Sequence, residues 1–136
     1  MNRIRLLIVD DDPSIANIIR ELLWSHDREC GKRFADIEIA SDLKRAVYVL
    51  TRSHSPVDVC LCDGNFPIKD GQAPGTHWAD VASLCHKLGV QFLLHSGDER
   101  AIQAAGEQGD RVLRKLDTSS EQMYAAVVES QQARAA

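Results

Sequence analysis

Short apolar runs recur along the chain, and each is followed by a segment whose apolar residues have helical spacing. The runs lie at residues 3–9, 37–39, 57–63, 90–94 and 112–113. Most of them are continuously apolar, which is typical of strands covered on both faces rather than on one. Strands that alternate with helices form a parallel sheet with helices on both sides, joined by right-handed crossovers. The pattern therefore predicts an α/β fold.

Few strand orders remain for five such units, and the flavodoxin-like (βα)5 order 2-1-3-4-5 is the best choice. This doubly wound parallel sheet places the carboxyl ends of the first and third strands side by side, at the point where the strand order reverses. Ligands bind at that point in open parallel sheets. Polar residues that follow these two strands are consequently the first candidates for a functional site.

The helical segments can be bounded from their apolar spacing. After Asp12-Pro13, the first helix is predicted to end near Trp24 or Ser25, and the polar residues 26–35 are predicted to form a loop. Its apolar stripe contains Ile15, Ile18, Ile19, Leu22 and Leu23.

Caps are predicted for three of the other helices. Ser41 is the predicted cap of the second helix and Thr76 that of the third, while Thr118 and Glu121 form a capping box for the last. The helix from about Asp98 to Gln108 has a buried face made mostly of alanine, so we expect it to be weakly packed.

Acidic residues follow the two strands that meet at the predicted switch point. Asp10, Asp11 and Asp12 end the first strand, and Asp63 ends the third. Asp12 is explained as a helix cap before Pro13. Asp10 and Asp11 are not explained in this way, because like charges at the end of a buried strand repel one another unless a cation compensates them. Carboxylates with waters and a phosphate are ligands that Mg²⁺ accepts.

Composition and charge narrow the classes of protein. At 136 residues and 44% hydrophobic, the chain fits a single domain over residues 1–136 with a sizeable core. A net charge of −4 without a basic run argues against direct nucleic-acid binding. The apolar runs are too short for a signal peptide or a membrane span, so the expected location is the cytoplasm without a membrane partner.

Cysteine and histidine positions point to no metal centre. The cysteines at 30, 60, 62 and 85 form no CxxC pair, and a zinc site with the histidines has no supporting spacing. Cys60 and Cys62 lie two apart on a predicted strand, so we expect them to share a buried face as reduced thiols.

The order of these features resembles the receiver domain of two-component response regulators. The resemblance rests on Leu6-Leu7-Ile8-Val9 before Asp10-Asp11, on Asp63 with Asn65, Pro67 and Asp70-Gly71 after it, on Ser96-Gly97 after the fourth strand, and on Lys115 after the fifth. It covers nearly the whole chain. Each piece alone is common, but all of them occur in order at strand ends.

The resemblance implies a role for each of these residues. Asp63 would be the phosphoacceptor, and Mg²⁺ would be the cofactor, bound by Asp10 through water, by Asp11 directly, by Asp63 and by the backbone carbonyl of Asn65. Ser96 would hydrogen-bond the phosphoryl group, and Lys115 would pair first with Asp63 and then with the phosphate. These roles agree with what phosphoryl transfer requires, since a cation, an ammonium and a hydroxyl offset the negative charge on the oxygens of the transferred group. His95, next to Ser96, is interpreted as structural.

The resemblance also implies partners and an output. The phosphoryl donor would be a histidine kinase or a histidine phosphotransfer protein, and the response would be an altered interaction with an unknown downstream protein. A phosphorylation-dependent homodimer is compatible with this. The chain is expected to be a signalling module and not an enzyme, because no separate general acid for phosphate hydrolysis is evident.

Two departures from the family pattern keep a second function open. Leu116 stands where the family has a proline after the lysine, and we expect a trans peptide there because a cis bond before a non-proline residue costs about 2.5–4 kcal/mol. Val112 stands where the family commonly has an aromatic switch residue. The alternative is a pseudo-receiver, a binding module that phosphorylation does not control.

Overall fold

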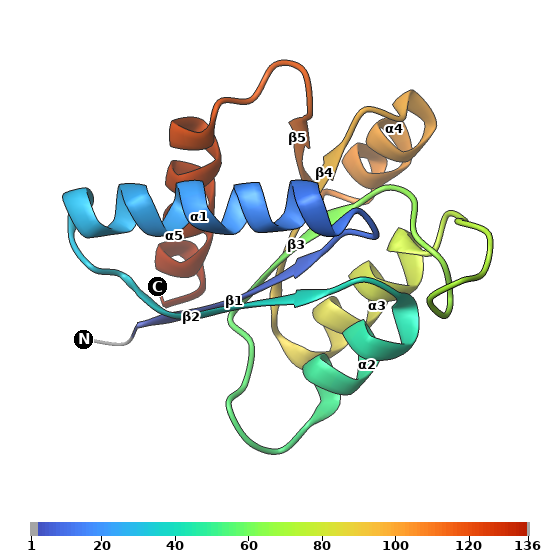
Figure 1. The fold of residues 1–136 in the computed structure, drawn as a ribbon, viewed down its shortest axis with the longest axis horizontal. Coiled ribbons are helices and arrows are strands. Elements are labelled where there is room, and N and C mark those ends of the chain that lie inside the picture. The colour runs from blue at the N-terminus through green and yellow to red at the C-terminus, as the bar shows by residue number, and fades with distance from the viewer. Residues whose placement is uncertain (1–2, 136) are drawn as a thin grey trace.

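The structure is a computed structural model that describes residues 3–135 and contains a five-stranded parallel sheet in the order β2-β1-β3-β4-β5 (Figure 1). The strands are β1 (Ile4–Val9), β2 (Phe34–Ala40), β3 (Val59–Asp63), β4 (Gln91–Ser96) and β5 (Arg111–Arg114). The helices are α1 (Pro13–Cys30), α2 (Leu43–Thr51), α3 (Trp78–Leu88), α4 (Glu99–Glu107) and α5 (Ser120–Ala135). The predicted flavodoxin-like fold and strand order are confirmed.

Helices cover both faces of the sheet. Helices α1 and α5 pack on one face, and α2, α3 and α4 pack on the other (Figure 1). The strands supply alternate side chains to the two resulting cores, so Leu61 joins the α1/α5 core while Cys60 and Cys62 join the other. The two cysteines therefore share a buried face, as predicted. A hydrogen bond with Cys85, together with burial, holds the pKa of the Cys60 thiol well above its usual range.

The strand register aligns the carboxyl ends that carry the candidate residues. Val9 pairs with Cys62, which places Asp10 beside Asp63. Asp63 in turn pairs with His95 of β4. Just after β5, the Lys115 amide donates to the Ser96 carbonyl oxygen at 3.1 Å. The predicted convergence of strand ends is thus built by continuous backbone pairing.

Helix α1 is longer than predicted, because its last turns contain a buried polar residue. Asp27 is 2% exposed and lies four positions after Leu23, on the buried side of the helix. Its carboxylate accepts hydrogen bonds from the Arg33 amide at 2.6 Å, from the Phe34 amide at 3.1 Å and from the Tyr124 hydroxyl at 2.8 Å. Residues 26–30 are therefore helical, and residues 34 and 35 already belong to β2. The predicted loop over 26–35 was wrong at both ends, and only residues 31–33 connect the two elements.

The buried stripe of α1 is also narrower than predicted. Ile19 and Leu23 are 8% and 0% exposed, whereas Ile15, Ile18 and Leu22 are 41%, 59% and 42% exposed. Five apolar residues on adjoining turns cannot all face one sheet, and Ala16 is the residue of the first turns that is fully buried.

The caps of α2 and α3 differ from the predicted ones. Helix α2 is capped by Asp42, whose carboxylate accepts from the Arg45 amide at 2.7 Å. Ser41 instead donates its hydroxyl to Asp70 at 2.8 Å. Helix α3 begins after His77 without a side-chain cap, so the prediction of Thr76 was wrong.

The capping box of α5 lies one residue later than predicted. The Ser119 amide donates to Gln122 Oε1 at 2.8 Å, and the Gln122 amide donates to Ser119 Oγ at 3.1 Å. This is the reciprocal pair of a capping box, with glutamine in place of Glu121. For α4 the predicted buried face of mostly alanine is confirmed, since Ala101, Ile102 and Ala105 are its buried residues.

The segment between β3 and α3 is held in place although it is long. Phe66 and Gly75 exchange backbone hydrogen bonds of 3.1 and 3.0 Å, and the Phe66 side chain is fully buried. The Leu43 amide at the start of α2 donates to the Pro67 carbonyl at 2.9 Å. The chain that leaves Asp63 is therefore fixed against α2.

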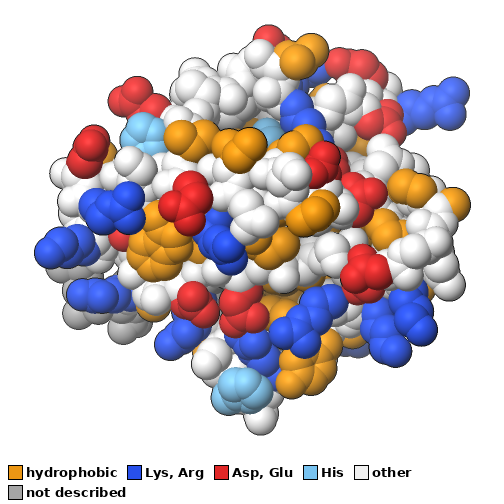
Figure 2. Space-filling model, in the orientation of Figure 1, with side chains coloured by type: hydrophobic (Ala, Val, Ile, Leu, Met, Phe, Trp, Pro, Cys, Tyr) orange, Lys and Arg blue, Asp and Glu red, His pale blue; other side chains and the backbone are white. Residues whose placement is uncertain are grey.

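The visible surface mixes charges of both signs. On the face in Figure 2, Lys and Arg side chains are interspersed with Asp and Glu, and hydrophobic side chains lie between them. Within residues 3–135, every helix is too short or too polar to cross a membrane.

Candidate functional site

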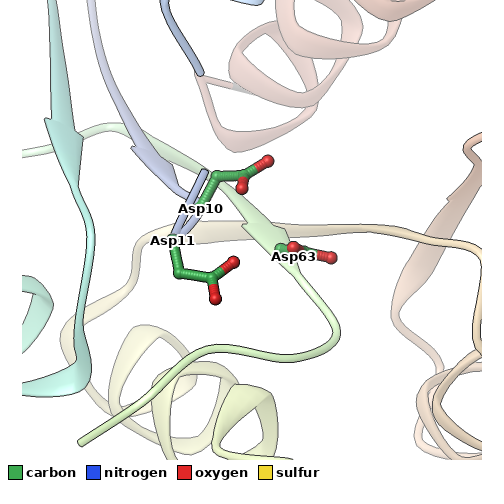
Figure 3. A group of neighbouring side chains, drawn as sticks. All are labelled: Asp10, Asp11 and Asp63. Carbon is green, nitrogen blue, oxygen red and sulfur yellow. The ribbon is translucent and has the colours of Figure 1, made fainter. Parts of the chain in front are cut away.

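Three carboxylates gather beyond the ends of β1 and β3. Asp10 and Asp11 follow β1 and Asp63 ends β3, and their side chains surround one space (Figure 3). One carboxylate oxygen from each lies within 4.8 Å of the others. The structure thus brings Asp10 and Asp11, for which the strand pattern predicted a cation, together with Asp63, which the resemblance added as a metal ligand.

Asp10 is the most deeply buried of the three, at 2% exposure. Its pKa is raised to about 6, mainly by burial and to a smaller extent by the charges of Asp63 and Asp11. A hydrogen bond from the Asp12 amide to Asp10 Oδ1, at 2.9 Å, and the charge of Lys115 act in the opposite direction. Protein groups therefore compensate this carboxylate incompletely, and a cation in the space would stabilise its charged form.

Asp63 is held by two donors on the same oxygen. The Lys115 ammonium lies 3.0 Å from Asp63 Oδ1, and the Gly64 amide donates to that oxygen at 2.7 Å. Both contacts are made to Oδ1, and neither donor contacts Oδ2. The side chains of Asp63 and Lys115 are 13% and 29% exposed, so the ion pair is accessible at the edge of the sheet.

Ser96 lies at the end of β4 and is 2% exposed. Its Oγ accepts a hydrogen bond from the Asp98 amide at 3.0 Å. Asp98 also caps α4, accepting from the Arg100 amide at 2.9 Å. The hydroxyl is therefore fixed to the first turn of α4, and sequence reasoning did not find this role of Asp98.

Asn65 lies next to the acidic group but is not part of it. Its side-chain amide donates to Asp98 Oδ2 at 3.5 Å, which links the chain after β3 to the start of α4. Its backbone carbonyl remains a predicted metal ligand.

His95 lies on the opposite side of β4 from Ser96 and is 7% exposed. Burial and the charge of Lys115 lower its pKa to about 4. The imidazole is consequently neutral at neutral pH and takes no proton from the neighbouring ammonium. This agrees with its interpretation as a structural residue.

The donor set fits a hard divalent cation. Three carboxylates face one another with the Lys115 ammonium beside Asp63, and oxygen ligands of this kind suit Mg²⁺. Zinc is a poorer match, because Cys60, Cys62 and Cys85 are buried in the core and Cys30 lies at the end of α1.

The two departures in β5 and after it are visible in the structure. The peptide between Lys115 and Leu116 is trans, as predicted, and Leu116 is 97% exposed. Val112 is partly buried against the core that contains α4. Neither side chain contributes to the acidic group.

No protein-family model matches the chain, and no curated protein matches it significantly. Many solved structures do match, and receiver domains are prominent among them. A response regulator receiver protein from Sinorhizobium medicae WSM419 is 20% identical, with a TM-score of 0.74 and 97% of each chain covered. A receiver domain protein from Clostridium thermocellum is 17% identical, with a TM-score of 0.73 and 97% of each chain covered. A CheY-like one from Methanospirillum hungatei JF-1 is 16% identical, with a TM-score of 0.74 and 98% of each chain covered.

At these identities the likeness concerns the fold. The fold of this chain is that of response regulator receiver domains over nearly its whole length. A shared fold does not determine the chemistry, which depends on the residues that this chain places at the site.

Proposed function

We propose that this chain, which has the fold of response regulator receiver domains, is a phosphorylatable receiver of a two-component phosphorelay. It accepts a phosphoryl group on Asp63 and signals through altered protein binding. The observation that supports this most is the grouping of Asp63 with Lys115 and two further carboxylates at the ends of parallel strands. A structural role alone does not account for three acids that face one another, with Lys115 as the ammonium beside Asp63.

The geometry of Asp63 favours one of its oxygens as the nucleophile. Oδ1 is occupied by Lys115 and by the Gly64 amide, so Oδ2 is the oxygen we expect to attack phosphorus. A bond forms between Oδ2 and phosphorus while the bond from phosphorus to the donor breaks, and the donor group leaves with the electron pair. The two donors on Oδ1 keep the carboxylate aligned during this step.

The other residues stabilise charge on the transferred group. Lys115 is close enough to Asp63 to follow the phosphoryl oxygens once the carboxylate has become an acyl phosphate. The Ser96 hydroxyl accepts from Asp98 and so retains its own proton for a phosphoryl oxygen. Mg²⁺, when bound by Asp10, Asp11, Asp63 and the Asn65 carbonyl, would neutralise further negative charge on that group.

The partners follow from the same proposal. The phosphoryl donor is a histidine kinase or a histidine phosphotransfer protein. The downstream partner, to which the phosphorylated chain binds differently, is another protein. Neither direct nucleic-acid contact nor membrane contact is part of the proposal. A homodimer that forms on phosphorylation is compatible with it, as is a cytoplasmic location. We do not propose an enzymatic turnover of its own.

The test is incubation with Mg²⁺ and acetyl phosphate, followed by mass spectrometry. The wild-type chain should gain one acid-labile phosphoryl group on Asp63, and Asp63→Asn should gain none. Asp70→Asn is the matched control, because Asp70 is exposed, follows the same strand and bonds Ser41 outside the acidic group. It should be labelled like the wild type. Asp58, whose carboxylate accepts from the Arg5 amide at 2.9 Å, should carry no label.

The alternative is a pseudo-receiver, and the same experiment decides for it. If the folded wild-type chain gains no phosphoryl group from acetyl phosphate or from a phosphorylated donor protein, the phosphoacceptor proposal is wrong. The acidic group would then have to be explained as a cation site that stabilises a binding module.

A further inference from the structure

Gly64 lies directly after Asp63, and its missing side chain makes room for Ser96. A Cβ atom built on Gly64 would lie 2.4 Å from Ser96 Oγ and 3.1 Å from Ser96 Cβ. The first distance is far below any ordinary contact. The backbone of Gly64 does not have the positive φ that would require glycine. Glycine is therefore required at position 64 because any side chain there would take the space of the Ser96 hydroxyl.

The Ser96 hydroxyl lies on the α4 side of the sheet. Side chains alternate along a strand, so Leu94 and Ser96 point to the core that contains α4, while His95 points to the other core. The site for a Cβ on Gly64 is also near the Ala101 Cβ of α4, at 3.5 Å. Asp63 follows Leu61 by two positions and so starts from the opposite face. The hydroxyl thus lies across the sheet edge from the Asp63 side chain.

We infer that Gly64 is a positioning residue that provides a resting place for the Ser96 hydroxyl away from the phosphoacceptor. The resting place has two parts, the hydrogen bond from the Asp98 amide and the free volume at Gly64. This inference deepens the proposed function and rests on it, because it assigns control of the Ser96 hydroxyl to a glycine, which has no side chain that could contact a phosphoryl group.

Gly64→Ala separates the two positions of Ser96. An alanine methyl group would exclude the present Oγ position, and the serine side chain has other staggered rotamers available. Rotation breaks the bond to the Asp98 amide and frees the hydroxyl to face Asp63. In the chain without ligand, the Asp98 amide should then exchange with solvent faster than in the wild type.

The second measurement is the affinity for beryllium fluoride, a phosphoryl mimic, in the presence of Mg²⁺. We expect Gly64→Ala to bind it about five- to tenfold more tightly. In the wild type the Ser96 side chain must give up its hydrogen bond with the Asp98 amide before the hydroxyl can turn to the phosphoryl mimic, and this factor corresponds to the net free energy of one such bond. In a Ser96→Ala background, Gly64→Ala should leave the affinity unchanged. This double-mutant cycle isolates the effect that passes through the hydroxyl.

Gly97→Ala is the matched control. Gly97 lies next to Ser96, and a Cβ there would meet nothing within 4 Å. It should change neither amide exchange at Asp98 nor the affinity for beryllium fluoride.

The outcomes distinguish this inference from the proposed function. Unchanged exchange of the Asp98 amide in Gly64→Ala overturns the inference, whatever the phosphoryl mimic does. Faster exchange with an affinity that is equal or weaker overturns it as well. If the wild type binds no beryllium fluoride while the exchange at Asp98 still responds, the proposed function is wrong and the control of phosphoryl binding by Gly64 is overturned with it.

Discussion

Replacing Asp10 by asparagine should stabilise the chain at neutral pH in the absence of divalent cations. Asp10 is 2% exposed and its pKa is raised from 3.8 to about 6, mainly by burial. A shift of about 2 units corresponds to roughly 3 kcal/mol of lost stability above pH 6. The asparagine side chain would keep an oxygen for the Asp12 amide and remove the buried charge. We expect a gain of about 1–3 kcal/mol in the free energy of unfolding.

The sign of the pH dependence follows from the raised pKa. Well below pH 4 the carboxyl is protonated in both the folded and the unfolded state, so its burial has no electrostatic cost. As the pH rises through 4 to 6, the unfolded chain releases this proton first, and the wild type loses stability relative to Asp10→Asn. The gain from the substitution should therefore be complete near pH 7 and shrink toward pH 4.

Urea denaturation in EDTA at pH 7 and pH 5 measures this difference. Asp12→Asn is the control, because Asp12 is an exposed helix cap and asparagine caps about as well. Excess Mg²⁺ should stabilise the wild type more than Asp10→Asn and so reduce the gain. A loss of stability in Asp10→Asn that is the same at both pH values would refute the reasoning.

Two further predictions concern the folding of the chain and use urea denaturation as well. Tyr124→Phe should lower the free energy of unfolding by about 1 kcal/mol, because it removes one hydrogen bond to Asp27. Asp27→Ala should lower it by about 3 kcal/mol, because the Arg33 and Phe34 amides also lose their acceptor. A larger effect for Tyr124→Phe than for Asp27→Ala would contradict this. Ser119→Ala should lower the free energy of unfolding by about 1 kcal/mol, since Ser119 is the cap of α5. Thr118→Ala should lower it by less than half of that amount. Equal effects of the two substitutions would argue against Ser119 and Gln122 as the capping pair.

The arrangement of strands was predictable because it depends on a repeated pattern. Buried strands and amphipathic helices alternate along the whole chain, and chirality then leaves few strand orders. The acidic group was predictable for the same reason. Asp63 ends β3, and Asp10 and Asp11 come directly after β1, its neighbour in the sheet, so the strand pairing itself brings these residues close together.

The features that sequence reasoning missed depend on single side-chain contacts. Asp27 interrupts an apolar pattern, yet it belongs to the buried side of α1 because three donors converge on it. No periodicity contains that information. The contact between Gly64 and Ser96 joins residues that lie far apart in the sequence, at the ends of adjacent strands, and only the packed structure shows why a side chain is excluded there.

The cysteines make the molecule suitable for selective thiol chemistry. Cys30 is exposed at the end of α1, whereas Cys60, Cys62 and Cys85 are buried in the core between the sheet and its helices. Alkylating reagents attack thiolates, and burial also raises the pKa of Cys62 well above its usual range. A maleimide dye should therefore attach once to the native chain, at Cys30. The slower rate at which the dye attaches to the other three would measure how often the core opens. The natural cysteines thus allow unfolding to be followed without an engineered label.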